Sequence, residues 1–374
     1  VIQTATIAAV GVAFSRFTAY LIPQVGEDNI LLTLGSLKIS AAQVLAIAVI
    51  VLLTYTNTRG VKEGKIIQTT FTSVKLISLF GLIVLGFILA KESFWSSNWE
   101  NGWAATQVPK DAVGEVARDN WQPIGGAVLI GAIAASMVGS IFSSDAWNNV
   151  TFIAGEIKNP KRNIGLSLFL GTLMVSFIYV AANFMYLHVL PLQEIAYPTG
   201  NRVAVAASDA IFGPSGSTVI AVMIMISTFG CNNGLILAGA RVYYTMAQDG
   251  LFFKKAGHLN KNAVPGWALW AQAVVASLLC LSGSYNDLLT MISFVVVIFY
   301  ALTIVGIFIL RRKRPELERP YKAFGYPVLP IIYVLLGLTF CIFLAIFEPL
   351  YSLWGLGIVL LGIPLYYVAI AVRK

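Results

Sequence analysis

The sequence predicts an all-α membrane protein with several spans, and three observations carry this prediction. Of its 374 residues, 58% are hydrophobic and 11% are charged, whereas soluble chains average about 45–50% apolar and about 25% charged residues. The mean hydropathy is +0.80, as expected of a chain that is solvated by lipid. The apolar residues also gather in long runs separated by short polar stretches, which is typical of transmembrane helices.

A helix that crosses the hydrocarbon core needs about 20 predominantly apolar residues. We expect ten such helices, which together make residues 1–374 a single transmembrane domain. They cover residues 1–22, 40–57, 66–90, 123–154, 164–188, 216–246, 265–283, 286–310, 327–347 and 352–371. The longest polar connections between them are 91–122 and 189–215.

The basic residues predict which loops face the cytoplasm. Most of the 25 Lys and Arg residues fall in alternate loops, at 59–65, 158–162, 241–261, 311–322 and 373–374. Such residues concentrate in cytoplasmic loops, so the loop 311–326 is expected inside and the Trp-rich loop 91–122 outside. The sequence opens within an apolar run at Val1, and we therefore expect a truncated chain that lacks upstream helices.

The composition argues against several other classes of protein. The net charge of +8 is explained by the basic loops, so a nucleic-acid partner is not expected. The two histidines, His188 and His258, are far apart, and the three cysteines lie inside apolar runs. We therefore predict no metal, no cofactor and no catalytic residues of an enzyme. A purely structural or receptor-like protein would not explain an acidic residue inside a span.

That acidic residue lies in a span of abnormal length. A straight helix over residues 123–157 would be about 52 Å long, well beyond a hydrocarbon core of about 30 Å. Its middle, Gly139 to Asn149, is rich in small and polar residues and contains Asp145. Irregular backbone is tolerated at membrane depth only where protein or a cavity surrounds it. We expect a helix that is broken between Ser140 and Asn148.

Broken helices mark substrate sites in secondary transporters because their ends leave backbone N–H and C=O groups free for an ionic ligand. Ser143, Ser144 and Asp145 are therefore the candidate ligand-binding residues, with a packing seam of small residues as the alternative. Asp145 favours the functional interpretation, since intramembrane acids are energetically costly. Phe142 and Trp147 flank the break, and either they gate the site or they pack in the core.

One lysine lies inside a span. Lys75 is in the stretch 66–90, two to three turns too deep to reach the interface by extending its side chain. The functional interpretation is a fixed or titrating cation that replaces a coupling ion, and the alternative is a structural lysine. On a later span, the apolar residues 295–297, including Val297, suit an apolar substrate side chain.

Several stretches resemble a known family. They are Ser140-Ile141-Phe142, Ala146-Trp147-Asn148, residues 155–160 (GEIKNP), 229–234 (FGCNNG) with Arg241, and 312–320 (RKRPELERP), which is the most specific. The chain resembles the amino acid–polyamine–organocation superfamily, and within it the L-type amino acid transporters, from their third helix to their twelfth. The resemblance implies a LeuT-type fold of two inverted five-helix repeats plus two trailing helices, of which the first two helices are missing here.

The resemblance also implies roles for single residues. Phe142 matches the gating aromatic above the substrate, and the backbone of Phe142, Ser143 and Asp145 matches the carbonyls that receive the substrate ammonium. Lys75 matches a lysine that replaces a cation near the eighth helix, at about Ser227. Gln3 and Thr6 fall where the third helix lines the pocket.

The expected function is secondary transport of amino acids across the plasma (inner) membrane, by exchange or by proton-linked symport. Animal L-type transporters carry a cysteine after the third helix, whereas the loop 22–28 has none, so we expect no disulfide-linked heavy chain and a prokaryotic source. Relatives have a small neutral residue at Asp145. Its carboxylate either selects cationic amino acids or polyamines, or caps the inner half-helix at residues 146–148 and leaves a site for neutral L-amino acids. We favour the second.

Overall fold

A computed structural model describes residues 2–34, 37–100, 102–107, 121–198, 202–281, 285–319 and 322–371. Its α-helices are α1 (Ile2–Thr18), α2 (Ala41–Arg59), α3 (Val61–Leu89), α4 (Trp95–Trp99), α5 (Gly126–Ser143), α6 (Pro160–Val189), α7 (Leu192–Ala196), α8 (Val203–Phe212), α9 (Gly216–Gln248), α10 (Gly266–Cys280), α11 (Tyr285–Lys313), α12 (Val328–Phe347), α13 (Pro349–Leu360) and α14 (Gly362–Ala371). The 3-10 helices are η1 (Pro23–Val25), η2 (Trp147–Glu156), η4 (Gly213–Ser215) and η5 (Lys254–Gly257). Two short antiparallel hairpins pair β1 (Ile30–Leu34) with β2 (Leu37–Ser40) and β3 (Thr106–Gln107) with β4 (Gln122–Pro123).

The predicted all-α polytopic architecture is confirmed. A helix occupies each of the ten predicted stretches. Within the described part of the chain, seven helical segments are both long and apolar enough to cross a membrane. They are Ala41–Arg59, Thr69–Leu89, Gly126–Phe152, Pro160–Val189, Val203–Gln248, Leu288–Lys313 and Val328–Phe347.

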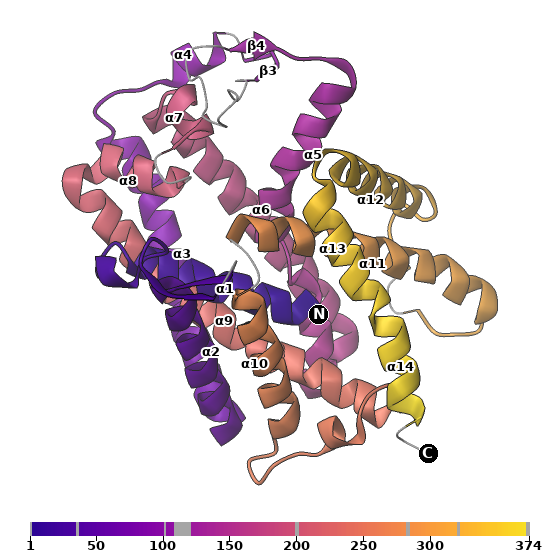
Figure 1. Ribbon diagram of the computed structural model, residues 1–374. Helices are drawn as coiled ribbons and strands as arrows, with labels where there is room; N and C mark the ends of the chain where they lie inside the picture. Colours follow the sequence, from indigo (N-terminus) through magenta and orange to yellow (C-terminus); the bar gives the residue numbers. More distant parts are fainter. Residues whose placement is uncertain are drawn as a thin grey trace.

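Helix α1 lies at the centre of the molecule and packs against α2, α9, α10 and α11 (Figure 1). Most of its residues are buried, and many of these are small, including Ala5, Ala8, Ala9 and Gly11. Lipid tails are as apolar as the helices, so helices associate in a membrane through close packing and not through the hydrophobic effect. Small residues allow the helix backbones to approach closely. The close approach explains how a helix of only 17 residues organises four neighbours.

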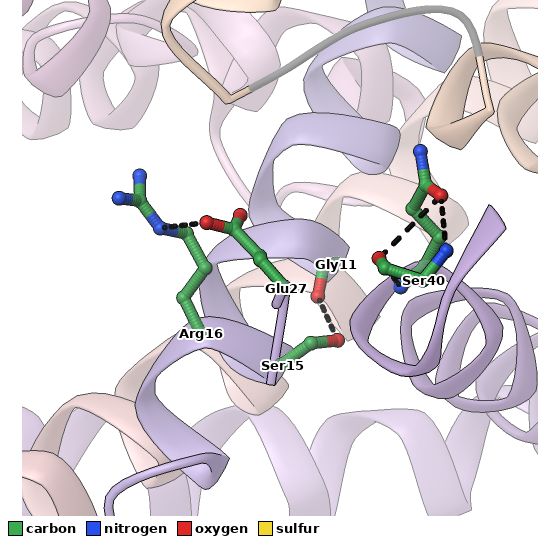
Figure 2. Close-up of polar contacts among 6 residues, drawn as sticks. Gly11, Ser15, Arg16, Glu27 and Ser40 are labelled. Atoms are coloured by element: carbon green, nitrogen blue, oxygen red, sulfur yellow. Dashed lines mark hydrogen bonds and ion pairs between the residues drawn. The ribbon is translucent and has the colours of Figure 1, made fainter. Parts of the chain in front are cut away.

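The segment between α1 and α2 is fixed at both ends. Arg16 Nε lies 3.2 Å from a carboxylate oxygen of Glu27 beyond the end of α1. Helix α2 begins with a capping box, in which Ser40 Oγ accepts the Gln43 N–H and the Gln43 side chain accepts the Ser40 N–H. Figure 2 shows the arginine pointing toward Glu27 and the dashed bonds around Ser40. A cap of this kind stabilises a helix by about 1 kcal/mol.

Buried amides tie the neighbouring helices to α9. Gln3 Nε2 donates to the Leu235 carbonyl at 3.1 Å, and Gln272 Nε2 donates to the Ile236 carbonyl at 2.6 Å. A third contact joins Asn57 Nδ2 to Asn233 Oδ1 at 2.9 Å. Hydrogen bonds between helices in a membrane contribute about 0.6–2 kcal/mol each, and these connect α9 to α1, α10 and α2. Helix α9 is unbroken over its 33 residues.

The chain differs from the prediction in two segments. The connection 189–215 was expected to be polar and irregular, but residues 203–212 form α8, whose buried side chains Val205, Ser208 and Ile211 recur at helical spacing. The last predicted helix is divided into α13 and α14 next to Pro364. Proline has no N–H for the preceding turn, so the helical hydrogen bonding is interrupted there.

Contacts between loops divide the molecule into two ends. Lys161 and Glu318 form an ion pair at 2.9 Å, and the amides of Asn260 and Asn262 donate to the Thr58 carbonyl. Each contact joins two of the loops that carry basic residues, and the end of α2 and the loop between α9 and α10 lie at the opposite end of the molecule from α4 (Figure 1). At the other end, α4 follows the last turn of α3 and lies beside the last turn of α6 (Figure 1). That the basic end is cytoplasmic stays a prediction.

Candidate functional site

The break between α5 and η2 is the candidate site. Helix α5 ends at Ser143, where Ser144 N–H still donates to the Ser140 carbonyl at 3.1 Å. The next bonds span only three residues, from Asp145 N–H to the Phe142 carbonyl and from Asn149 N–H to the Ala146 carbonyl. The interruption predicted between Ser140 and Asn148 is therefore present, with a 3-10 helix and not an α-helix on its far side.

Ala146 makes the turn. Its φ is +63°, in the left-handed region, which disfavours residues with a Cβ by about 1–2 kcal/mol. The conformation changes the direction of the chain between α5 and η2. Unfavourable backbone conformations that packing holds in place are common at functional sites. The conformation of Ala146 is therefore a second feature that favours a functional site at the break.

Two tyrosines from distant helices hold the break. The Tyr179 hydroxyl, on α6, donates to the Ser143 carbonyl at 2.8 Å. The Tyr300 hydroxyl, on α11, donates to Asp145 Oδ1 at 2.7 Å. The Tyr300 ring also packs against the indole of Trp147, with 5.5 Å between ring centroids. Tyr300 therefore contacts both the acidic residue and the first residue of η2.

The predicted role of Asp145 as a helix cap is wrong. The N-cap position of η2 is occupied by Ala146, and no side chain makes a cap hydrogen bond there. The Asp145 side chain is half-buried and accepts the Tyr300 hydroxyl instead. The left-handed turn at Ala146 separates Asp145 from the N–H groups of η2 that it was expected to bind.

The break faces a largely apolar cluster. Phe142 and Ala146 pack against the same group of buried side chains as Phe229, Cys231 and Tyr300. That group includes Val296 on α11 and much of α1. Ser143 and Ser144 are exposed, and Ser143 Oγ donates to the Ser140 carbonyl of its own helix. The structure thus brings together Phe142, the two serines, Asp145 and Trp147.

Lys75 and Ser227 lie at one level of the interface between α3 and α9. Phe71 packs on Gly230, since a Cβ added to that glycine would be 2.4 Å from the Phe71 Cβ. Further along, Leu82 shares a buried cluster with Ile220, so α3 and α9 run antiparallel. Lys75 is one turn beyond Phe71, and Ser227 is one turn before Gly230.

Three other predicted residues make contacts of their own on α1 and α11. Gln3 binds the backbone of α9, and the Thr6 hydroxyl is buried and donates to the Ile2 carbonyl of its own helix. Val297 packs against Gly337 on α12 and belongs to a buried cluster against which Ile141, next to Phe142, also packs. Its neighbour Val296 belongs to the cluster against which Phe142 packs. That these three residues line a substrate pocket stays a prediction.

Tyr179 and Tyr300 were not predicted from the sequence. Each is a hydroxyl-bearing residue within a long apolar stretch, and such groups need a hydrogen-bond partner when they leave water. The sequence contained that signal, but Tyr179 is 36 residues from its partner Ser143, and Tyr300 is 155 residues from its partner Asp145. Nothing local in the sequence indicates partners at such separations.

Comparison with known proteins identifies similar chains. The sequence model of a family described as amino acid permease matches residues 2–370. The b(0,+)-type amino acid transporter 1 of Mus musculus is 27% identical over 327 residues, which cover 87% of this chain and 62% of that protein. The large neutral amino acids transporter small subunit 2 of Homo sapiens is 27% identical over 334 residues, covering 88% and 58%. The Asc-type amino acid transporter 1 of Mus musculus is 27% identical over 338 residues, covering 90% and 59%.

These comparisons bear on two further expectations. The chain spans 58–62% of the length of these relatives. These three relatives are mammalian, so they do not support the expected prokaryotic source. All three cysteines of the chain, Cys231, Cys280 and Cys341, are free thiols within helices. That the protein works without a disulfide-linked heavy chain stays a prediction.

Proposed function

The chain belongs to the amino acid permease family, and on this basis we propose that it carries amino acids across a membrane by alternating access. The observation that best supports this proposal is the break between α5 and η2. It combines a helix C-terminus, a half-buried carboxylate and an adjoining apolar cluster in one place. An amino acid presents the matching groups, namely an ammonium and a side chain next to it.

The ammonium of the substrate binds at the end of α5. The C-terminus of a helix carries a partial negative charge of about half an electron, and Asp145 adds a carboxylate two residues beyond Ser143. The exposed hydroxyls of Ser143 and Ser144 supply further hydrogen-bonding groups. Phe142 closes the site on its apolar side, and Trp147, held against Tyr300, borders it at the start of η2.

We propose neutral amino acids as the substrates. The Tyr300 hydroxyl donates to the carboxylate of Asp145 and so directs part of its charge away from the substrate. Phe142, Phe229 and Val296 contribute apolar surface to the adjoining cluster, which suits an uncharged side chain. Cationic amino acids or polyamines remain the second candidate, because a half-buried carboxylate beside the break can pair with a second positive charge.

Lys75 is the proposed coupling group. A cation fixed between α3 and α9, at the level of Ser227, can stand where a coupling ion would otherwise bind. This arrangement supports an exchanger or a proton-linked symporter, since no additional metal cation is required.

The test is uptake of labelled amino acids by proteoliposomes, with and without a pH gradient, for the wild type and Asp145→Asn. The asparagine keeps an oxygen for the Tyr300 hydroxyl and removes the charge. We expect leucine uptake to be slower but to survive, because the C-terminus of α5 still attracts the substrate ammonium, and we expect its selectivity to be unchanged. Selective loss of lysine, arginine or putrescine uptake in the variant would favour the cationic alternative. If the wild type transports none of these compounds, the proposal of amino acid transport is wrong.

A further inference from the structure

An aromatic groove lies at the opposite end of the molecule from the basic loops. It has a volume of about 570 Å³ and is lined by Phe87, Trp95, Trp99, Phe184 and His188. Phe87 belongs to the last turn of α3, Phe184 and His188 to the last two turns of α6, and the tryptophans to α4. We refer to these five residues as the aromatic groove.

The short helix α4 is held firmly in place. Asn98 Nδ2 donates to the carbonyls of Leu187 and Leu190 at 2.9 and 2.8 Å, and Asn98 Oδ1 accepts the Leu192 N–H at 2.8 Å. The Phe94 N–H donates to the His188 carbonyl at 2.9 Å, and Ser93 Oγ lies 3.0 Å from His188 Nδ1. Because of these bonds the two tryptophans, spaced i and i+4, face α3 and α6 in a fixed position. The groove is a built feature and not a chance gap between side chains.

The rings that line the groove are set at several angles to one another. Trp95 meets Trp99 at an interplanar angle of 59° and Phe184 at 71°, and Phe87 meets His188 at 37°. Centroid separations are 5.8, 5.7 and 5.3 Å respectively. Rings at these angles do not offer the flat surface that suits a planar ligand such as a sterol. Aromatic faces attract cations, tryptophan most strongly, and groups of aromatic rings bind quaternary ammonium groups.

Charge around the groove also favours a cation. Among the described residues of segment 91–107, Glu92 and Glu100 outnumber Lys91, and all three are exposed. Exposed Glu194, close to the Leu192 that is bonded to Asn98, adds another carboxylate. The lining itself offers mainly ring carbon, so a cation that needs several hydrogen bonds would lose its water there without replacement. A quaternary ammonium has no N–H groups to satisfy.

The depth of the groove indicates the source of that cation. The spans Thr69–Leu89 and Pro160–Val189 both end beside it, so it lies where hydrocarbon gives way to lipid headgroups. Tryptophan is enriched at this boundary, and Trp95 and Trp99 remain partly exposed there. We propose that the aromatic groove binds the choline headgroup of a phosphatidylcholine molecule in the surrounding membrane. The binding anchors the ends of α3 and α6 to the lipid surface.

The test is native mass spectrometry of the purified protein with equal amounts of phosphatidylcholine and phosphatidylethanolamine that share the same acyl chains. The ethanolamine ammonium would lose hydrogen bonds to water among the rings, so the wild type should retain several-fold more of the choline lipid. The Trp95→Leu/Trp99→Leu variant keeps apolar side chains and removes the indole faces, so its preference should fall to about one. The matched control is Trp103→Leu, a residue that is 97% exposed and outside the groove, and it should keep the wild-type ratio.

Three results would overturn the proposal. The first is equal retention of the two lipids by the wild type. The second is an unchanged preference for the choline lipid in the double variant. The third is that a sterol displaces the choline lipid equally well from the wild type and from the double variant. If the double variant unfolds, the single variant Trp99→Leu is measured in the same way. It should retain part of the preference.

Discussion

At the residue scale, Tyr300 is the side chain on which the geometry of the break depends. Its hydroxyl donates to Asp145 and its ring packs on Trp147. Asp145 therefore has a partner inside the bundle, and its carboxylate needs no backbone cap. A half-buried charge that lost this donor would have to change its rotamer or its surroundings.

Tyr300→Phe should lower thermal stability through the loss of one charge-assisted hydrogen bond. Such bonds contribute about 1.5–3 kcal/mol, which corresponds to a fall of several degrees in the unfolding midpoint in detergent. The control is Tyr367→Phe on α14, whose ring is exposed, and it should leave the midpoint unchanged. If Tyr300→Phe causes the same loss in an Asp145→Ala background, the hydroxyl acts through another group and our account of the pair is wrong.

Phe142→Ala should reduce amino acid uptake at least about tenfold while the amount of protein in the membrane changes little. The side chain is half-buried beside the break, so its removal opens the site more than it weakens the core. Uptake per molecule, normalised by quantitative blotting, checks this. Phe169→Ala on α6 is the control, since Phe169 is exposed on the outside of the bundle. Parallel losses of uptake and abundance in Phe142→Ala would indicate a structural residue.

Lys75→Ala should lower the rate of uptake. The reason is that alanine removes the positive charge that we propose stands between α3 and α9 in place of a coupling ion. Initial rates of leucine uptake at several pH values give the measurement. The exposed Lys91, in a loop, supplies Lys91→Ala as the control. If Lys75→Ala retains the rate at each pH, the lysine is structural.

At the element scale, the close approach of α3 to α9 depends on Gly230. A Cβ there would lie 2.4 Å from the Phe71 Cβ and 3.1 Å from its Cγ. These atoms are at the stem of the side chain and cannot swing aside, so the helices would have to separate. The separation would move Lys75 away from the level of Ser227 and Cys231.

Gly230→Ala should therefore destabilise the protein by about 1–3 kcal/mol, as overpacked cores do. The matched control is Gly171→Ala in α6, where a Cβ meets nothing within 4 Å. An alanine at an uncrowded helical position is neutral or stabilises by up to about 1 kcal/mol. Thermal unfolding of both variants gives the comparison. A tolerated Gly230→Ala would show that the two helices are not in the close contact described.

Also at this scale, the sequence analysis predicted the helices better than their junctions. Hydropathy located all ten stretches because lipid-facing surface and bundle interior are both apolar. It passed over α8, whose polar flanks resemble a loop, and over the division between α13 and α14. The break in the abnormally long span 123–157 was predictable because its length and small, polar middle conflict with a single straight helix.

At the scale of the whole molecule, contacts between residues that are far apart along the chain were the hardest to predict from the sequence. Lys75 and Ser227 were paired through the family resemblance, and the structure puts them at one level. The pairing of Asp145 with Tyr300 joins residues 155 positions apart and has no local signal. Residues 295–297 were predicted together to suit an apolar substrate side chain, because a stretch of valines does not reveal which face of its helix meets the break.

The central claim is that the break between α5 and η2 binds the transported amino acid, and protection of an introduced thiol tests it most directly. Cys231, Cys280 and Cys341 are replaced by alanine, and Ser144→Cys is added at the exposed end of α5. Saturating leucine should slow modification of this thiol several-fold, and it should leave Ser167→Cys, on the exposed surface of α6, unchanged. Equal modification of Ser144→Cys with and without leucine, in protein that still transports leucine, would contradict the claim.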